Sequence, residues 1–332
     1  MRAAIVGCGD IHIMHALAID SLEGAELVAV CDVDPGALAA AEARYGVPGF
    51  ADHRRMLEAV RPDVVHVCTP HDQHAPCVID ALEAGAHVLQ EKPVAHTLAE
   101  AERIIAAADA APGQAAVCFQ NRYNATAQEA KRIIESGELG APLGASATVL
   151  WSRDQAYYDV KPWRGTWENS GGGALINQAI HTIDLAEWLL GEVVSVSGHA
   201  SNRRHPGIEV EDTAEAVFEH AGGARTVFFA TTAHVANEPV RVEIVLERGR
   251  LSLGEELVVH AEGGSTRVVK ERQGPDDGRS YWGVSHQELI GDFYAAIRED
   301  HPFWISPRVG LRSLSHLKEI YAQSGYTEAG AR

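Results

Sequence analysis

The segment from residue 171 to 184 reads GGGALINQAIHTID, and its polar residues have a spacing that could serve chemistry. Asn177, His181 and Asp184 follow three glycines at offsets of four and three, so a helix would place all three on one face. Imidazole titrates near neutrality, which makes His181 the best proton carrier in the chain. The row could be catalytic, could hold a metal, or could be the solvated edge of an ordinary helix. It offers zinc one good ligand plus a carboxylate, with no cysteine nearby, so we expect no metal.

A second candidate is Lys92, in the triplet Glu91-Lys92-Pro93 that follows a predicted strand. Oxidation of an alcohol requires a hydride acceptor, a base for the hydroxyl proton and stabilisation of the developing alkoxide. A lysine held between the end of a strand and a proline can be partly desolvated, which lowers its pKa. Lys92 therefore fits the role of stabilising the alkoxide, and His181 fits the role of the base.

A glycine-rich loop lies near the start of the chain, in IVGCGDIHIMHA. Gly7 permits a tight turn, and Gly9 lets the backbone approach a pyrophosphate at the start of the following helix. His12 stands where the G-x-G-x-x-G motif has its third glycine, which weakens the motif. Asp32 ends the second predicted strand, where a carboxylate accepts hydrogen bonds from an adenosine ribose and disfavours a 2′-phosphate. The sequence therefore predicts NAD, with NADP less favoured, bound by Gly7, Gly9, Asp10, Ile11 and Asp32.

The hydrophobic pattern predicts the scaffold that must position these residues. Up to residue 122, short apolar runs alternate with helical patterns, which is typical of βαβ units and a parallel sheet covered on both faces. From residue 123, longer half-polar runs with period-two alternation indicate antiparallel strands, and two amphipathic helices follow. We therefore predict an α/β chain with a dinucleotide-binding domain over 1–122. An α+β domain with a large, mostly antiparallel open sheet, for substrate binding and oligomerisation, is predicted over 123–332.

Composition narrows the class of protein. The 332 residues carry a formal net charge of −18, which disfavours nucleic acid and anionic membranes as partners. No apolar run reaches about 18 residues, so no membrane-spanning helix is expected. The N-terminal MRAAIVGCGD is too short for a signal peptide and leads into a predicted strand. The five cysteines are an odd number without a C-x-x-C pair, so we expect a reduced, cytoplasmic setting.

The motifs together resemble the Gfo/Idh/MocA oxidoreductases, the family of glucose–fructose oxidoreductase and inositol dehydrogenase. The resemblance rests on HVLQEKPVAHT, VCTPHDQH, NRY at 121–123 and WRGTWENSGGGALINQAIHTIDLAEWLLG, and it covers nearly the whole chain. It implies an N-terminal Rossmann domain, a nicotinamide cofactor, a polyol, sugar or nucleotide-sugar substrate, and an open sheet that forms homodimers or homotetramers. The segment around GGGALINQ resembles members that act on UDP-amino-sugar acids. The resemblance also implies cofactor contacts from Thr69, Pro70, His74, Glu91 and Lys92.

The resemblance also implies separate roles for Asn177, His181 and Asp184. It implies that His181 lies beside the nicotinamide and the substrate. Members of the family often carry aspartate at the position of Asn177, and an amide cannot accept a proton. We therefore expect Asn177 to hydrogen-bond the substrate or to orient His181, while Asp184 either fixes the imidazole or packs the helix. The expected substrate contacts are Arg122, Tyr158, Trp163, Arg164, Asn177 and His181, with only one of the two arginines expected to bind an anionic group.

The resulting hypothesis is an NAD-dependent dehydrogenase that oxidises a secondary hydroxyl of a sugar, sugar derivative or cyclitol, or reduces the corresponding ketone. Lys92, His181 and Asn177 form its catalytic set. Two alternatives stay open, namely a redox-neutral glycosidase-type enzyme of the same fold that retains its NAD, and a non-catalytic NAD-binding regulator.

Overall fold

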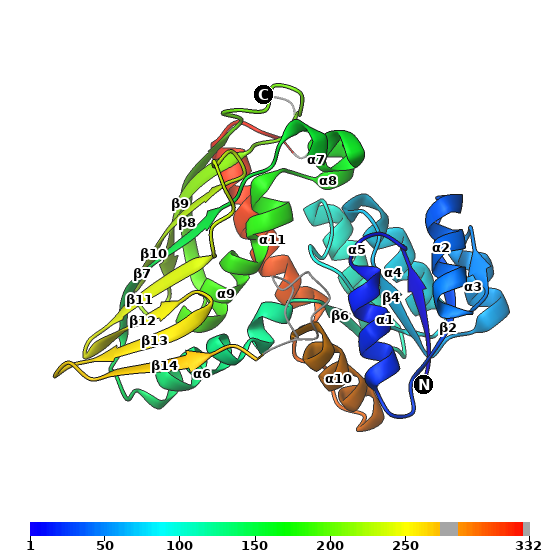
Figure 1. The fold of residues 1–332 in the computed structure, drawn as a ribbon, viewed down its shortest axis with the longest axis horizontal. Coiled ribbons are helices and arrows are strands. Elements are labelled where there is room, and N and C mark those ends of the chain that lie inside the picture. Colours follow the sequence, from blue (N-terminus) through cyan, green and yellow to red (C-terminus); the bar gives the residue numbers. More distant parts are fainter. Residues whose placement is uncertain (273–284, 328–332) are drawn as a thin grey trace. The chain divides into compact units, whose positions relative to one another are not determined.

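The structure is a computed structural model that describes residues 1–272 and 285–327, and the chain forms two compact units (Figure 1). The first unit combines Met1–Gln120 with Val284–Leu311, and the second combines Asn121–Gly283 with Arg312–Arg332. The chain therefore returns to the first unit near its end. The predicted division at residue 122 cuts the chain into two consecutive parts and assigns this returning segment to the second part. As a division of function it stays a prediction.

A six-stranded parallel sheet forms the centre of the first unit, in the order β3-β2-β1-β4-β5-β6. Strand β4 is buried throughout and β1 is buried except at Arg2, as expected for a sheet covered on both faces. The direction of the strand order reverses beside β1, and such sheets bind ligands outside the carboxyl ends of the strands at this point. The strands are β1 (Arg2–Val6), β2 (Glu26–Cys31), β3 (Gly49–Phe50), β4 (Val64–Val67), β5 (His87–Gln90) and β6 (Ala115–Val117).

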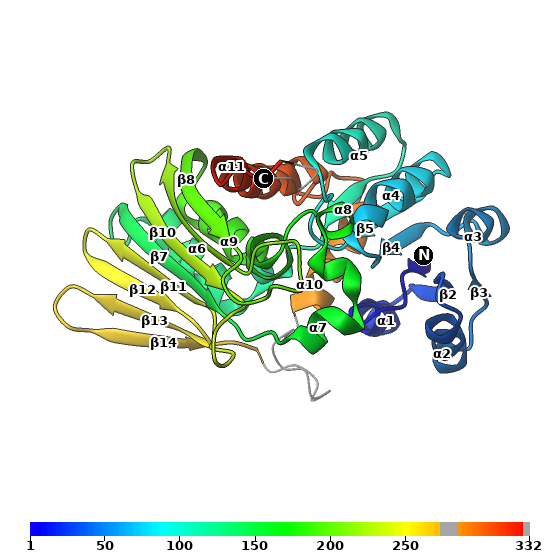
Figure 2. The ribbon, with the colours of Figure 1, turned by 90° about the horizontal axis from the view of Figure 1, so that it is seen from above.

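Helices cover both faces of this sheet. Figure 2 shows α1, α2 and α10 on one face and α3, α4 and α5 on the other. Helix α2 illustrates the local signals, because the Asp34 side chain accepts a hydrogen bond from the Ala37 backbone nitrogen at 2.7 Å, Pro35 begins the helix, and Gly46 ends it with a left-handed φ of 68°. The helices are α1 (His12–Ser21), α2 (Pro35–Tyr45), α3 (His53–Val60), α4 (His74–Glu83), α5 (Leu98–Ala110) and α10 (Ser285–Arg298). The predicted parallel α/β unit is confirmed.

The second unit contains an eight-stranded sheet in the order β14-β13-β12-β11-β7-β10-β9-β8. Its neighbours pair in antiparallel fashion, except that β7 and β10 run parallel. The predicted large and mostly antiparallel sheet is therefore confirmed. The strands are β7 (Pro142–Leu150), β8 (Val193–Ser201), β9 (Thr213–His220), β10 (Arg225–Thr231), β11 (Arg241–Leu246), β12 (Gly249–Leu253), β13 (Glu256–Ala261) and β14 (Thr266–Lys270).

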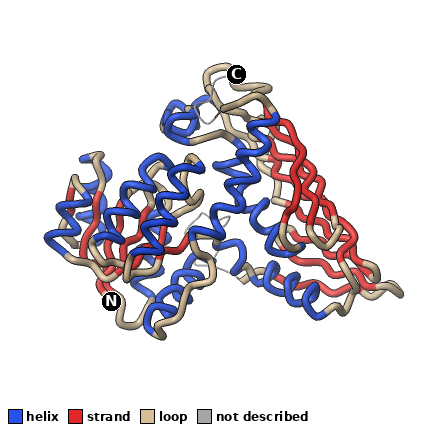
Figure 3. Tube along the Cα trace, turned by 180° about the vertical axis from the view of Figure 1, so that it is seen from behind, coloured by secondary structure: helices blue, strands red, loops and turns tan. Residues whose placement is uncertain are grey.

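Helices cover one face of this sheet. Helices α6 (Ala125–Ser136) and α9 (Ile180–Leu190) pack against it on the same face, and Figure 3 shows no helix of this unit on the opposite face within the described residues. Burial alternates accordingly along β10, where Phe228 is 1% exposed while Val227 is 58% and Phe229 is 38% exposed. The remaining helices are α7 (Gln155–Val160), α8 (Trp167–Ser170) and α11 (Pro307–Gln323). Across residues 1–272 and 285–327, no helix has the length and apolar character that a membrane crossing requires.

Candidate active site

The loop after β1 is held close to the loops after β2 and β4 by Gly7. Its backbone nitrogen donates to the carbonyl of Cys31 at 2.8 Å. A Cβ atom at Gly7, whose φ is 96°, would lie 2.6 Å from the carbonyl of Cys68 and 2.8 Å from the nitrogen of Thr69. Only glycine fits this close approach, because both the conformation and the contact exclude a side chain. Helix α1 then begins with no side-chain cap at Ile11, so its first backbone N–H groups are available to an anion.

Asp32 lies directly beside this loop. One carboxylate oxygen accepts a hydrogen bond from the Cys8 nitrogen at 2.6 Å, and the other accepts one from the Asp34 nitrogen at 2.8 Å. Each oxygen keeps a further lone pair, so the carboxylate can still accept from a ribose hydroxyl. His12, at the third position of the motif, contacts the carbonyl of Gly9, and burial lowers the pKa of its imidazole. Asp10 is exposed at the surface of the loop.

His74 ties the loop after β4 to the segment after β5. Its Nδ1 lies 2.7 Å from the carbonyl of Pro93 and its Nε2 lies 3.1 Å from the carbonyl of Thr69. The ring is buried, and burial lowers its pKa. Gln90 supports the same segment, since its Nε2 donates to the carbonyl of Val94 at 2.7 Å. His74 thus shapes the loop that carries Lys92, whose peptide bond to Pro93 is cis.

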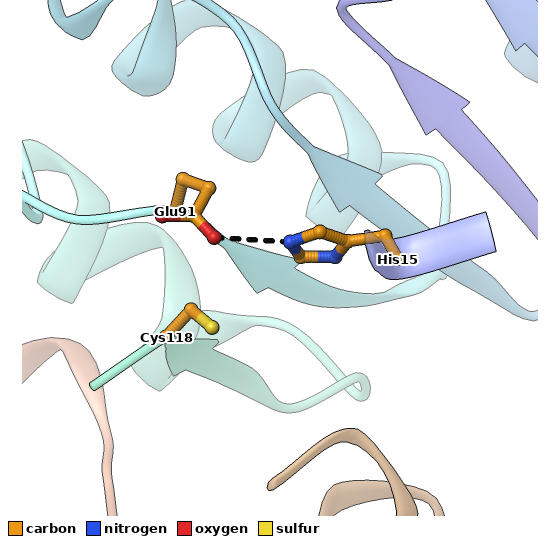
Figure 4. A group of neighbouring side chains, drawn as sticks. All are labelled: His15, Glu91 and Cys118. Carbon is orange, nitrogen blue, oxygen red and sulfur yellow. Dashed lines mark hydrogen bonds and ion pairs between the residues drawn. The ribbon is translucent and has the colours of Figure 1, made fainter. Parts of the chain in front are cut away.

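Sequence reasoning missed a buried chain of hydrogen bonds that ends on Glu91. The phenol oxygen of Tyr294 lies 2.9 Å from His66 Nε2, His66 Nδ1 lies 2.8 Å from His15 Nδ1, and His15 Nε2 lies 3.0 Å from Glu91 Oε1. All four side chains are buried, and Figure 4 shows the last link. The imidazole of His286 lies beside this chain without a hydrogen bond to it, with its Nε2 3.6 Å from the same carboxylate oxygen. His15, His66 and His286 are far apart in the sequence, so no local motif indicated that they come together.

The histidines keep the Glu91 carboxyl ionised. Burial by itself would raise its pKa, but the facing imidazoles of His15 and His286 outweigh burial and hold the pKa well below the usual range. Burial lowers the pKa values of His15 and His66, so both imidazoles favour the neutral form. Neutral imidazoles can form every hydrogen bond of this chain, because each needs only one N–H group if Tyr294 donates to His66, His66 to His15 and His15 to Glu91. The residue directly before Lys92 is therefore a buried anion.

The same place contains the one group of potential metal ligands found among the described residues. A nitrogen of His15, a carboxylate oxygen of Glu91 and the sulfur of Cys118 lie within 4.8 Å of one another (Figure 4). The hydrogen bond between His15 and Glu91 already uses both of their facing atoms. Burial raises the pKa of the Cys118 thiol well above its usual value, which disfavours the thiolate that a metal requires. The arrangement is explained by hydrogen bonding without a metal.

In the second unit, the predicted polar row lies on a helix that starts irregularly. A five-residue π-helix, Leu175–Ala179, precedes α9, so Asn177 lies on the π-helical turn and His181 on the first turn of α9. Both side chains are half-buried. Single π-helical turns inside helices occur frequently at functional sites because they change the direction of the side chains they carry. The helix was predicted from the sequence, but its π-helical start was not.

Asp184 binds Arg122 through two parallel hydrogen bonds. The Arg122 Nε and an Nη donate to the two carboxylate oxygens at 2.8 and 2.7 Å, and Ser313 Oγ lies 3.3 Å from the carboxylate. Arg122 is 6% exposed and Asp184 is 1% exposed. Burial raises the pKa of Asp184, whereas the guanidinium of Arg122 opposes that rise. This pair supports the packing role for Asp184 and gives Arg122 a structural partner inside the protein.

The predicted aromatic residues lie before the glycines, Tyr158 on helix α7 and Trp163 on a 3-10 helix over Pro162–Gly165, and they differ in exposure. Tyr158 is buried, with its hydroxyl 3.3 Å from Thr232 Oγ1, whereas Trp163 and Arg164 are half-buried. The guanidinium carbon of Arg164 lies 4.3 Å from the ring centre of Tyr157, and that of Arg153 lies 5.1 Å from the same ring. The Tyr157 hydroxyl also accepts a hydrogen bond from Gln178 on the π-helix at 3.0 Å. No sequence pattern had indicated Arg153 as a site residue.

Comparisons with known proteins agree with this architecture. Residues 1–119 match the family model described as "Oxidoreductase family, NAD-binding Rossmann fold", and residues 127–252 match "GFO/IDH/MocA C-terminal domain". A curated scyllo-inositol 2-dehydrogenase (NAD(+)) from Bacillus subtilis is 28% identical over 82% of this chain and 81% of its own length.

Solved structures extend the similarity over the whole chain. The WlbA dehydrogenase from Bordetella pertussis, in complex with NADH and UDP-GlcNAcA, is 33% identical, with a TM-score of 0.87 over 98% of this chain and 95% of its own. A levoglucosan dehydrogenase in complex with NADH and levoglucosan is 25% identical, with a TM-score of 0.85 over 98% and 97% of the two chains. The chain is therefore an NAD-binding oxidoreductase that belongs to the GFO/IDH/MocA family.

Proposed function

We propose that the chain is an NAD-dependent dehydrogenase that oxidises a secondary hydroxyl of a sugar, sugar derivative or cyclitol, or reduces the corresponding ketone. One observation carries the proposal. The glycine loop and the Glu91-Lys92 segment leave the carboxyl ends of β1 and β5, two strands of one parallel sheet. A cation is thereby placed at the edge of the sheet where dinucleotides bind.

Residues of the first unit alone are sufficient to bind NAD in the proposed site. Gly7 has no side chain, so a cofactor can approach its backbone closely. The first backbone N–H groups of α1 have no side-chain cap and can bind a pyrophosphate. The Asp32 carboxylate can accept a hydrogen bond from the ribose. The bound nicotinamide would supply the hydride acceptor. Asp10, Ile11, Thr69 and Pro70 complete the loops expected to contact the cofactor.

The proton chemistry is assigned to two side chains, Lys92 and His181. Lys92 stabilises the developing alkoxide, and His181 takes the hydroxyl proton. Asn177 hydrogen-bonds the substrate or orients the imidazole.

For the substrate, we propose a sugar with an anionic group, such as a UDP-activated sugar acid. Arg153 and Arg164 both stack on Tyr157, so two guanidinium groups lie against one ring in the segment before the glycines. Arginine binds carboxylate and phosphate through paired hydrogen bonds. A solved relative, WlbA, carries UDP-GlcNAcA in its complex. Trp163 and Tyr158 belong to the same segment and complete the proposed substrate contacts.

Turnover assays with NAD and a set of substrates test the proposal. We expect UDP-GlcNAcA to be oxidised with net formation of NADH and with a higher kcat/KM than scyllo- or myo-inositol. Arg164→Gln should raise KM for the anionic substrate about tenfold, with Arg103→Gln, an exposed arginine on α5, as the matched control. Product formation without net NADH would favour the redox-neutral enzyme, and NAD binding without turnover of any substrate would favour the regulator.

We further propose a cytoplasmic homodimer or homotetramer formed through the uncovered face of the second sheet. Exposed apolar side chains gather there, including Val227, Phe229 and Val245. All five cysteines are buried and free, which suits a reducing compartment.

A further inference from the structure

A buried glutamate lies beneath the start of the helix that carries Asn177 and His181. Glu211, in the segment before β9, is fully buried. One carboxylate oxygen accepts from the Gly173 nitrogen at 2.7 Å, and the other accepts from the Leu175 nitrogen at 2.8 Å. Its backbone carbonyl accepts from the Ala174 nitrogen at 3.1 Å. Three successive backbone N–H groups at the helix start are thus bound by this one residue, which no sequence motif had indicated.

Tyr321 of α11 completes the arrangement from the opposite side. Its hydroxyl donates to Glu211 Oε1 at 2.8 Å, and the ring is 2% exposed. Lys318, one turn earlier on α11, donates to the carbonyl of Gly171 at 3.0 Å. The glycine turn is therefore bound by a carboxylate, a phenol and an ammonium group from two other segments of the same unit.

Two of the three glycines in the opening motif, Gly172 and Gly173, are explained by this packing. A Cβ atom at Gly173 would lie 1.9 Å from the backbone oxygen of Glu211, and one at Gly172 would lie 2.2 Å from the hydroxyl of Tyr321. The chain must pass this close for the two backbone nitrogens to reach the carboxylate. The Asn177 nitrogen in turn donates to the carbonyl of Gly173 at 3.0 Å, which continues the path from the carboxylate into the π-helical turn.

We propose that Glu211 is a positioning residue, whose carboxylate fixes the helix start and thereby the orientation of Asn177 and His181. The inference rests on the roles proposed above for these two residues. Glu211 affects these two side chains only through its hydrogen bonds to the backbone of the helix start. We propose no contact between Glu211 and the substrate or cofactor.

The ionised form of Glu211 is the one that fits its neighbours. All three groups that reach the carboxylate are donors, and a protonated carboxyl would bring a fourth proton to the same place. Burial raises the pKa of Glu211 to about 7, although the hydrogen bonds from Leu175, Tyr321 and Gly173 oppose the rise. The other titratable groups around it are Tyr321 and Lys318 on α11, Tyr158 on α7 and the adjacent Asp212.

Three variants test the inference. Glu211→Gln keeps the size of the side chain but puts an amide donor against a backbone N–H group. We expect kcat to fall about 10- to 100-fold with KM for NAD unchanged, because small displacements of catalytic groups have effects of this size. Tyr321→Phe removes one donor to the carboxylate, so the acidic limb of the pH–rate profile should move to higher pH while kcat at alkaline pH is retained. Glu187→Gln, a buried glutamate on α9, is the matched control and should keep the wild-type pH profile.

Amide hydrogen exchange provides a readout that does not depend on turnover. In the wild type, exchange over residues 173–181, corrected for the intrinsic pH dependence, should slow as the pH rises through about 7. Glu211→Gln should exchange fast at every pH in this segment and normally elsewhere. Unchanged exchange and an unchanged pH–rate profile in Glu211→Gln would overturn the inference. If that variant fails to fold, Tyr321→Phe decides, since exchange over residues 173–181 that slows at the same pH as in the wild type contradicts the proposal. Lack of turnover on every substrate, with pH-dependent exchange intact, would instead reject the proposed function alone.

Discussion

Lys92 directly follows a glutamate that is buried and ionised. His15 and His286 hold the pKa of Glu91 well below its usual range against the effect of burial. At the residue scale, the proposed role of Lys92 is that of a cation that stabilises the developing alkoxide.

Replacing this cation should abolish most of the activity. We expect Lys92→Met to lower kcat about 10²- to 10³-fold, which is the effect of losing one group that stabilises a developing oxyanion. The affinity for NAD should change little, as measured by titration of the protein's fluorescence. Lys270→Met, which alters an exposed lysine on β14, serves as the control. Wild-type turnover by Lys92→Met would show that the assigned mechanism is wrong.

The amide at position 177 gives a second prediction at this scale. Asn177→Asp introduces a carboxylate four positions before His181, and an anion there favours the protonated imidazole. The limb of the pH–rate profile assigned to His181 should therefore move to higher pH, as measured by kcat/KM over a pH series. An unshifted profile would assign Asn177 to substrate contact alone.

At the scale of elements, the helix start at residues 171–181 depends on the segment before β9. The backbone of Glu211 occupies the space in which a side chain at position 173 would lie. A short turn of glycines is consequently the only sequence that lets the π-helix begin at this depth in the unit.

This packing makes Gly173 sensitive to the smallest substitution. We expect Gly173→Ala to lower the free energy of unfolding by about 2–3 kcal/mol through overpacking, and to reduce kcat because the helix start moves. Urea denaturation together with turnover assays checks both effects. Gly222→Ala, at a glycine with no heavy atom within 4 Å of the added Cβ, should leave both nearly unchanged. Equal behaviour of the two variants would contradict the contact at Gly173.

At the scale of the whole molecule, the second sheet presents an apolar surface that no described part of the same unit covers. Alternation along β10 buries Phe228 against the helices and exposes Val227 and Phe229 on the other face. An open sheet face of this composition is typical of a surface that packs against another subunit.

A charge at this face should therefore change the oligomeric state. We expect Phe229→Glu to convert the proposed homo-oligomer into monomers, as measured by light scattering during gel filtration, because a buried unpaired carboxylate opposes association. Leu17→Glu, at an exposed apolar position on α1, should leave the mass unchanged. A monomeric wild type, or an oligomeric variant, would contradict the proposed interface.

The sequence by itself determined the features that depend on short-range spacing. Gly7 and Gly9 follow a strand, Asp32 ends the next one, and Pro35 and Gly46 bound a helix, so each signal can be recognised within a few residues. Alternation of period two likewise predicted the antiparallel sheet, since it reports which face of each strand is buried. The nature of the fold and its nicotinamide cofactor followed from these local patterns.

Tertiary structure decided the features that join residues far apart in the chain. Nothing in the local sequence pairs Tyr294 with His66, Arg122 with Asp184, or Glu211 with the turn at Gly173. Buried polar groups must find partners when water is removed, and packing determines which partners lie within reach. For this reason the sequence revealed which residues could do chemistry, whereas only the folded chain showed which groups hold them in place.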